Sequence, residues 1–130
     1  MTNERKIRIG ITQGDTNGIG YEVILKTFSD PAMLELCTPV IYGSSKIMSY
    51  HRKAVGVQAF QTNNVKSVDY LKENLPNVVE VCSDEVKVEL GKADKQAGKA
   101  AFLALEAAIT DLKKGKIDAI VTAPISKENI

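Results

Sequence analysis

Three glycines near the start of the chain could bring the backbone close to a ligand. They are Gly14, Gly18 and Gly20, and they follow the short apolar stretch 7–11. Closely spaced glycines let the backbone turn sharply and present its N–H groups to an anion. The segment therefore predicts a ligand-binding loop between a strand and a helix, with the three glycines as candidate cofactor-binding residues.

The spacing of these glycines separates the segment from the common nucleotide-binding loops. Three residues and then one residue lie between them, so the pattern is not G-x-G-x-x-G, and no Lys-Ser/Thr pair follows as in a Walker A loop. The spacing matches that of short-chain dehydrogenases. Tyr42 and Lys46 have the Tyr-x-x-x-Lys spacing of that family's catalytic pair, but they lie much too early in the chain, so we interpret the pair as a coincidence. A purely steric use of the glycines stays open.

Two polar residues inside the glycine segment favour contact with a substrate. The carboxylate of Asp15 would repel a pyrophosphate, but near a helix N-terminus it could bind a hydroxyl or an amine. Asn17 precedes the expected helix and is the better candidate for its cap. Asp15 and Asn17 are therefore predicted substrate-binding residues.

A second chemically informative segment follows the last apolar stretch, 117–121. Thr122 places a hydroxyl where that stretch ends, and Lys127 falls in the first turn of an expected helix. A lysine there opposes the helix dipole, which favours pairing with a phosphate or carboxylate of a ligand. A solvated lysine stays the alternative. Thr122 and Lys127 are the other two predicted substrate-binding residues.

Strands that alternate with helices must position these two segments. The apolar patterns predict strands over 7–12, 39–43, 57–60, 78–82 and 117–121, and helices over 19–29, 44–54, 68–74 and 96–114. Asp30-Pro31 should end the first helix, Ser44 should cap the second, and Gly115 should end the last. The last helix has residues that recur at the spacing of one buried face: Ala97, Ala101, Ala104, Leu105, Ala108 and Leu112. The alternation predicts an α/β fold with a largely parallel sheet flanked by helices, the last strand buried on both faces. Both informative segments would then leave the carboxyl edge of the sheet, where such folds bind ligands.

Composition excludes several classes of function. With 44% apolar residues and a net charge of +1, the chain can form a core and has no charge pattern for nucleic acid. The polar start and the lack of a long apolar run predict a cytoplasmic protein without membrane contact. Cys37 and Cys82 are expected to be free buried thiols, and His51 a solvated surface residue, so no metal site is predicted within these residues.

Three segments together resemble the 4-hydroxythreonine-4-phosphate dehydrogenase family. They are 11–22, with the glycines, 96–101, within the longest expected helix, and 115–127, with the second loop. Their order and separation agree with the family over the whole chain. The sequence departs from the usual pattern at Gln13, Thr16 and Tyr21, which leaves the identity of the substrate open.

The resemblance implies a cytoplasmic homodimer of isocitrate/isopropylmalate-dehydrogenase-like two-domain fold that acts in pyridoxal phosphate biosynthesis. Such enzymes use NAD and a divalent metal (Zn, Mg or Co) to oxidise and decarboxylate 4-phosphooxy-threonine, and a sister group acts on phosphorylated four-carbon sugar acids. The family's metal ligands and nicotinamide-binding segments lie beyond the second loop. Residues 1–130 would thus be the N-terminal α/β portion of a longer enzyme, inactive alone, and no catalytic residue is assigned.

Two other interpretations of the sequence stay open. In one, the chain is a short-chain-type module in which Gly14, Gly18 and Gly20 hold NAD without further protein. In the other, it is a non-catalytic α/β domain that binds a partner through the edge of its sheet. Binding of NAD by the chain alone would distinguish the first from a portion of a longer enzyme.

Overall fold

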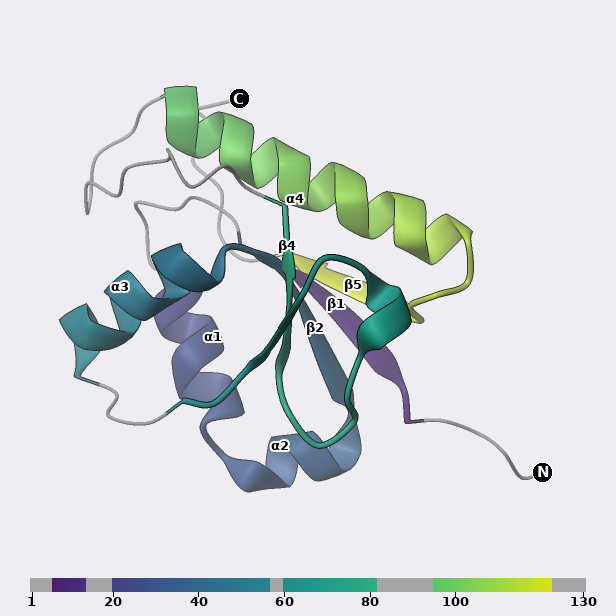
Figure 1. Ribbon diagram of the computed structural model, residues 1–130, viewed down its shortest axis with the longest axis horizontal. Helices are drawn as coiled ribbons and strands as arrows, with labels where there is room; N and C mark the ends of the chain where they lie inside the picture. Colours follow the sequence, from purple (N-terminus) through teal and green to yellow (C-terminus); the bar gives the residue numbers. More distant parts are fainter. Residues whose placement is uncertain (1–5, 14–19, 57–59, 82–94, 123–130) are drawn as a thin grey trace.

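The structure is a parallel sheet of five strands with helices on both faces (Figure 1). This computed structural model describes residues 6–13, 20–56, 60–81 and 95–122. The strands lie in the order β3-β4-β2-β1-β5 and every pair is parallel. The elements are β1 (Arg8–Thr12), α1 (Gly20–Phe28), α2 (Pro31–Leu36), β2 (Thr38–Gly43), α3 (Ser45–Val55), β3 (Asn63–Val65), the 3₁₀ turn η1 (Val68–Tyr70), β4 (Asn77–Glu80), α4 (Lys95–Lys113) and β5 (Ala119–Thr122). The predicted α/β class with a parallel sheet is confirmed.

Local capping explains where the helices begin and end. The Ser44 hydroxyl accepts a hydrogen bond from the Ile47 N–H at 3.3 Å, and α3 ends at Gly56 with φ 78°, a backbone conformation that favours glycine. The predicted end of the first helix before 30–31 is confirmed, since α1 ends at Phe28, and a short helix that the sequence did not predict begins at Pro31. Asp30 caps α2 by accepting from the Ala32 N–H, and Pro31 suits the first helical turn because it needs no donor there.

The third strand lies later in the chain than predicted. The sequence favoured 57–60, of which only Phe60 lies within the described residues, and Phe60 belongs to no strand. The strand is Asn63–Val65, in a polar stretch where apolar alternation gives no signal. Hydrogen bonds of Asn63 fix the pairing of this strand with β4. Asn63 Nδ2 donates to Asn77 Oδ1 at 2.9 Å, and the Asn63 N–H donates to the Pro76 carbonyl. The helix expected over 68–74 is only the 3₁₀ turn Val68–Tyr70.

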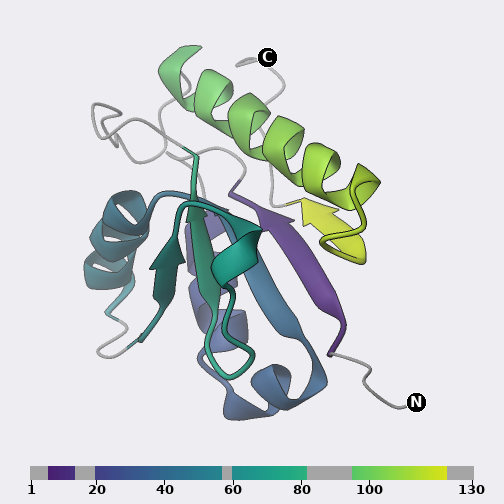
Figure 2. The ribbon, with the colours of Figure 1, turned by 45° about the vertical axis from the view of Figure 1, so that its right-hand side comes forward.

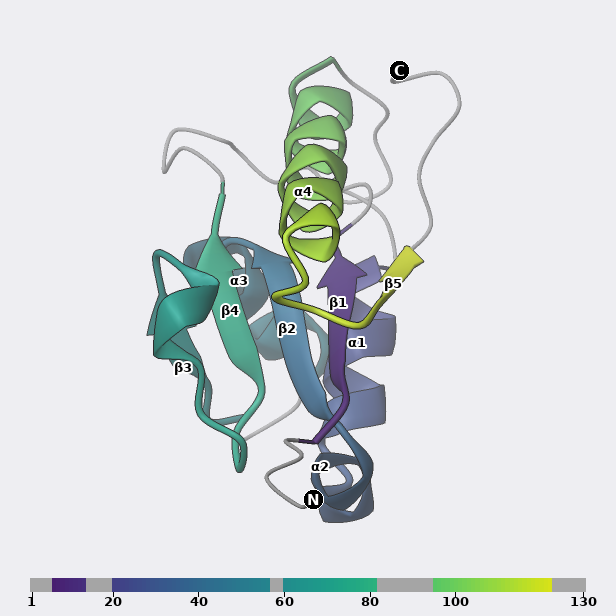
Figure 3. The same cartoon turned by 90° about the vertical axis from the view of Figure 1, so that its right-hand side faces the viewer.

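Two apolar clusters sit on the two faces of the sheet, and Figure 3 shows α4 on one face with α1 and α3 on the other. Large side chains such as Tyr21, Leu25 and Met48 fill the α1/α3 face. Small ones fill the α4 face, where Ala104 and Ala108 pack on the strands. On the face of this helix that the sequence predicted to be buried, Ala101, Ala104 and Ala108 are buried, whereas Leu112 is 38% exposed.

The last strand differs from its prediction. The sequence favoured burial on both faces, but β5 lies at the edge of the sheet beside β1 and near α4 (Figure 2), and Val121 is 55% exposed. Apolar β-branched residues predict a strand without fixing whether neighbours cover it, so composition alone could not place β5 at an edge.

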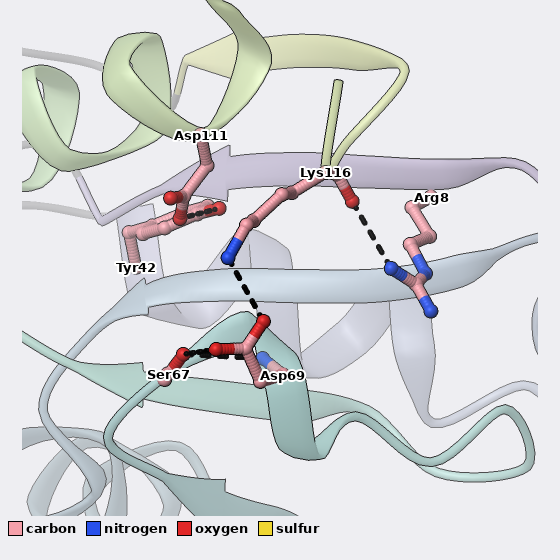
Figure 4. Close-up of polar contacts among 6 residues, drawn as sticks. All are labelled: Arg8, Tyr42, Ser67, Asp69, Asp111 and Lys116. Atoms are coloured by element: carbon pink, nitrogen blue, oxygen red, sulfur yellow. Dashed lines mark hydrogen bonds and ion pairs between the residues drawn. The ribbon is translucent and has the colours of Figure 1, made fainter. Parts of the chain in front are cut away.

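Polar contacts tie the amino edge of the sheet together. In Figure 4, Lys116 reaches from the turn before β5 to Asp69 at 2.9 Å, and Arg8 Nη1 donates to the Lys116 carbonyl. The backbone N–H of Arg8 donates to Asp118 at 2.8 Å. These contacts join β1, η1 and the α4–β5 turn at the edge away from both informative segments.

Candidate functional site at the carboxyl edge

The register of β1 and β5 brings the two informative segments together. Thr12 closes β1, Thr122 closes β5, and the two residues are register partners in a parallel pair. The chain therefore leaves the sheet at adjacent points of the same edge after each of these residues. Helix α1 begins at Gly20, at the end of the first segment. The strands that lead into both segments thus end at one carboxyl edge, as predicted, while residues 14–19 and 123–127 lie outside the described residues and their roles stay predictions.

Two of the predicted site residues lie within the described part of the chain. Gly20 is buried at the start of α1, and Thr122 is exposed at the end of β5. The other predicted substrate- and cofactor-binding residues lie outside the described residues: Gly14, Asp15, Asn17, Gly18 and Lys127.

A polar network that the sequence did not predict joins the flanks of the glycine segment. Gln13 and Tyr21 are both completely buried, and the Tyr21 hydroxyl donates to Gln13 Oε1. Gln13 Nε2 donates to the Ala100 carbonyl of α4 at 3.1 Å, and the Ser44 N–H donates to the Tyr21 hydroxyl at 2.9 Å. The only sequence signal was that Gln13 and Tyr21 both depart from the family pattern, and two departures eight residues apart do not reveal a contact.

The placement of His51 is a correction. The sequence predicted a solvated residue, but His51 is 2% exposed and its ring stacks on Tyr21, with centroids 5.2 Å apart. The polar neighbours of His51 suggested a surface position. Ile47 and Met48, one turn earlier, share its helix face and are buried, which places His51 under α3 rather than on its outside.

The positive end of α3 already has an anionic partner. The Glu80 carboxylate accepts from the Ser45 N–H at 2.8 Å and from the Ser45 hydroxyl. A carboxylate in this position satisfies free backbone donors and complements the helix dipole. An anionic ligand would therefore have to displace Glu80, so the N-terminus of α3 is a poor candidate for phosphate binding.

The Tyr42 and Lys46 spacing has no catalytic meaning in the structure. Tyr42 is completely buried on the α4 face, whereas Lys46 lies on α3, which covers the opposite face. The Tyr42 hydroxyl donates to Asp111 at 2.8 Å (Figure 4), and burial, followed by this bond and the Asp111 charge, raises the pKa of Tyr42 far above its ordinary value. Such a phenol is a poor proton donor.

Metal ligands are not gathered in the described part of the chain. No group of three or more His, Cys, Asp or Glu side chains there could hold a metal ion. Cys37 is a free buried thiol, as predicted, and burial raises its pKa; Cys82 lies outside the described residues. No helix in the described ranges is long and apolar enough to cross a membrane.

Other polar and hollow features do not mark a site. Among the described residues the buried Thr12 hydroxyl has no hydrogen-bond partner, but neither has the Thr38 hydroxyl at the opposite edge, so the feature does not single out the carboxyl edge. A hollow of 420 Å³ lies between α4 and β4, lined by side chains of both charges, including Lys66, Glu80 and Glu106. It does not touch Thr12 or Thr122.

Comparison with known proteins identifies the family. The profile of the family described as pyridoxal phosphate biosynthetic protein PdxA matches residues 35–130. The chain belongs to the PdxA family. This membership confirms the resemblance seen in the sequence.

PdxA-family relatives match almost the whole chain. A 4-hydroxythreonine-4-phosphate dehydrogenase of Bacteroides thetaiotaomicron is 61% identical over 127 residues, which are 98% of this chain and 35% of that protein. A protein of Clostridium botulinum strain Hall, named "Putative D-threonate 4-phosphate dehydrogenase", is 31% identical over 133 residues, or 100% of this chain and 39% of that one. The chain thus spans less than two fifths of the length of these relatives.

Solved structures of PdxA-type enzymes share this fold. A 4-hydroxythreonine-4-phosphate dehydrogenase from Burkholderia phymatum superposes with a TM-score of 0.85 at 27% identity, covering 97% of this chain and 38% of that structure. The enzyme of the same name from Klebsiella pneumoniae gives a TM-score of 0.82 at 25% identity, covering 98% and 39%. The neighbours of this chain are therefore oxidoreductases by name, and its fold is theirs.

Proposed function

We propose that the chain forms the N-terminal α/β portion, residues 1–130, of an enzyme that oxidises and decarboxylates 4-phosphooxy-threonine in pyridoxal phosphate biosynthesis. The enzyme uses NAD and a divalent metal, works in the cytoplasm and is a homodimer. The 61% identity to a 4-hydroxythreonine-4-phosphate dehydrogenase supports this substrate more strongly than any other.

One observation carries the proposal: the pairing of Thr12 with Thr122 at the end of two adjacent parallel strands. It supports the proposal because the chain leaves the sheet toward both motif segments at one edge, where ligands bind in parallel α/β sheets. Thr122 is exposed at this edge, and the N-terminus of α1 lies at the same edge. In the proposed enzyme Asp15, Asn17 and Lys127 add polar contacts to the substrate.

The metal ligands and most of the NAD site belong, in this proposal, to protein outside this chain. The described residues supply no metal-ligand cluster. A divalent metal in such an enzyme polarises the substrate alcohol and the oxygen of the ketone that forms. The part of this chain is to bind the substrate and orient it, since the edge offers hydroxyls and a helix terminus rather than an assigned base.

A phosphorylated sugar acid is the second candidate substrate. The 31% identical relative from Clostridium botulinum carries a D-threonate 4-phosphate dehydrogenase name, and it matches the chain from end to end. Threonate has a hydroxyl where threonine has an amine. The two candidates therefore differ at one group, which a carboxylate such as Asp15 would distinguish, because a carboxylate forms an ion pair only with the protonated amine.

A chimera tests the proposal. This chain replaces the matching segment of the Bacteroides thetaiotaomicron relative, and the chimera is assayed for NADH formation with zinc, NAD and either phosphorylated acid. We expect turnover, with a higher kcat/KM for 4-phosphooxy-threonine than for 4-phosphothreonate. The chain alone should show no turnover and no NAD binding by calorimetry.

Three results of these assays would contradict the proposal. A folded chimera without turnover, beside an active parent, would favour a non-catalytic domain. Higher kcat/KM with phosphothreonate would move the assignment to the sugar acid. Tight NAD binding by the chain alone would mean that the cofactor site lies within these residues.

A further inference from the structure

The two residues that flank the glycine segment are bonded to each other. Gln13 directly follows β1 and Tyr21 is the second residue of α1, so the Tyr21–Gln13 hydrogen bond joins the point where the chain leaves the sheet to the point where it enters the helix. Both side chains are completely buried. A side-chain contact therefore holds these two points at a fixed separation.

The same pair is anchored to two further elements. Gln13 Nε2 donates a hydrogen bond to the Ala100 carbonyl of α4, and the Tyr21 hydroxyl accepts one from the Ser44 N–H at the start of α3. The backbone adds another bond, from the Gln13 N–H to the Tyr42 carbonyl at 3.2 Å. Four elements thus converge on one tyrosine hydroxyl and one glutamine amide behind the carboxyl edge.

Close packing leaves this contact no room to move. A Cβ on Gly43 would overlap the Tyr21 hydroxyl and would lie 3.1 Å from Gln13 Oε1. The His51 ring stacks on the Tyr21 ring with an interplanar angle of 16°. Close-packed groups of this kind keep one geometry, because any shift loses several contacts at once.

We propose that Gln13 and Tyr21 are positioning residues that set substrate binding at the carboxyl edge, a role that rests on the proposed function. They touch neither substrate nor cofactor, since both are completely buried. They act by fixing where β1 ends and α1 begins, and so where Gly20 and the first N–H groups of α1 face the ligand. Small misplacements of binding groups reduce catalytic efficiency strongly, which gives such a pair a functional effect beyond its effect on stability.

The substitution Tyr21→Phe tests the pair in the chimera with the Bacteroides thetaiotaomicron relative. Phenylalanine keeps the ring and its stacking on His51 but removes the donor to Gln13 and the acceptor of the Ser44 N–H. The matched control is Tyr42→Phe, which removes one hydroxyl of an equally buried tyrosine, bonded to Asp111 on the other face. We expect kcat/KM for the phosphorylated substrate to fall about tenfold with Tyr21→Phe, mainly through KM, and less than about twofold with Tyr42→Phe.

A double variant tests whether the two residues act as one unit. Gln13→Met should lower kcat/KM about as much as Tyr21→Phe, and the double variant should lose little more than either alone, because residues that act through one contact are not additive. If the loss in kcat/KM of the double variant equals the product of the two single losses, the positioning role is wrong. It is also wrong if Tyr21→Phe and Tyr42→Phe lower kcat/KM equally at equal stability.

Amide hydrogen exchange separates failure of this inference from failure of the proposed function. It is measured on the same folded chimera and needs no turnover. Tyr21→Phe should speed exchange at the hydrogen-bonded amides of Ser44 and Gln13 by about tenfold or more, while Tyr42→Phe should leave these amides unchanged. Unchanged exchange in Tyr21→Phe would reject the inference even if the enzyme is active. Faster exchange in a chimera without turnover would keep the contact and reject only the function.

Discussion

The two faces of the sheet are packed in different ways. On the α1/α3 face, Tyr21, Leu25 and Met48 fill the space between sheet and helices with large side chains. On the α4 face, Ala104 and Ala108 let one long helix lie close to the strands. The buried Tyr21 hydroxyl of the first face bonds Gln13, which reaches α4 through the Ala100 carbonyl, whereas the Tyr42–Asp111 contact of the second face joins strand to helix.

Two tyrosines make this difference visible. Tyr21 and Tyr42 are both completely buried, and each hydroxyl is hydrogen-bonded. Tyr42 donates to Asp111 near the end of α4, far along the helix from its first turns. Tyr21 donates to Gln13 beside the glycine segment. Equal burial therefore supports different tasks: one contact holds a helix on the sheet, and the other fixes an edge proposed to bind substrate.

Shortening a large side chain of the α1/α3 face should give the largest loss of stability. Leu25 is completely buried, so Leu25→Ala leaves a cavity and should lower the free energy of unfolding by about 2–5 kcal/mol in urea denaturation. Leu36→Ala is the control, because Leu36 is 70% exposed and should change the value by less than about 0.5 kcal/mol. Equal effects at the two positions would mean that Leu25 does not belong to a packed core on this face.

Glycine-to-alanine substitutions test how far the side chains around two buried glycines can move to make room for a methyl group. The Cβ of Gly43→Ala meets the Tyr21 hydroxyl, which is locked in its network, and should cost about 1–3 kcal/mol. The Cβ of Gly10→Ala would lie 2.6 Å from the end of the Ile117 side chain and 3.1 Å from the Tyr42 ring. The end of the Ile117 side chain can shift by rotation, so a smaller loss is expected. Urea denaturation of both variants gives the order, and a larger loss for Gly10→Ala would contradict the rigid Tyr21 contact.

Loss of the Lys116–Asp69 pair at the amino edge should change the free energy of unfolding least. Hydrogen bonds from Lys116 and then Ser67, with the Lys116 charge, lower the pKa of Asp69 below its ordinary 3.8, and the Asp69 contacts raise that of Lys116 above 10.5. The Asp69 contribution to stability is therefore present above about pH 4 and is lost as pH falls through the lowered pKa. The Lys116 contribution is present below its ordinary pKa and is lost as pH rises through the raised one.

Denaturation of Asp69→Asn across pH and salt checks this pair. The difference from the parent chain should be small near neutral pH, smaller in high salt, and absent below the lowered pKa of Asp69. Glu73→Gln, another exposed carboxylate, serves as the control. A difference that grows as the solution becomes more acidic would contradict the expected direction.

Much of the fold could be predicted from the sequence because apolar periodicity and caps are local signals. The alanine stripe of α4 and the Ser44 cap of α3 were both found in this way. The strand Asn63–Val65 was missed because the amide contacts of Asn63 and Asn77 fix it, and these join residues fourteen apart. The position of β5 at the edge depends on which strands pair with it, and a local sequence pattern does not give that information.

The candidate site was predicted at the level of segments and not of contacts. Parallel strands place their carboxyl ends at one edge, so the meeting of the segments after Thr12 and Thr122 followed from the α/β pattern. The burial of His51 and its stacking on Tyr21 did not follow, because both depend on how α3 packs against α1. The Gln13–Tyr21 bond depends on the same packing.

The most direct test of substrate binding at the carboxyl edge is to find which backbone amides of this chain a bound substrate protects from hydrogen exchange. Amide hydrogen exchange of the folded chimera is compared with and without saturating 4-phosphooxy-threonine, residue by residue. We expect slower exchange at the carboxyl edge, at Thr12, Gly20 and Thr122, and no change at the amino edge, at Arg8 and Asn77. Protection confined to the amino edge, or no protection at either edge in an enzyme that turns over, would contradict binding at the carboxyl edge.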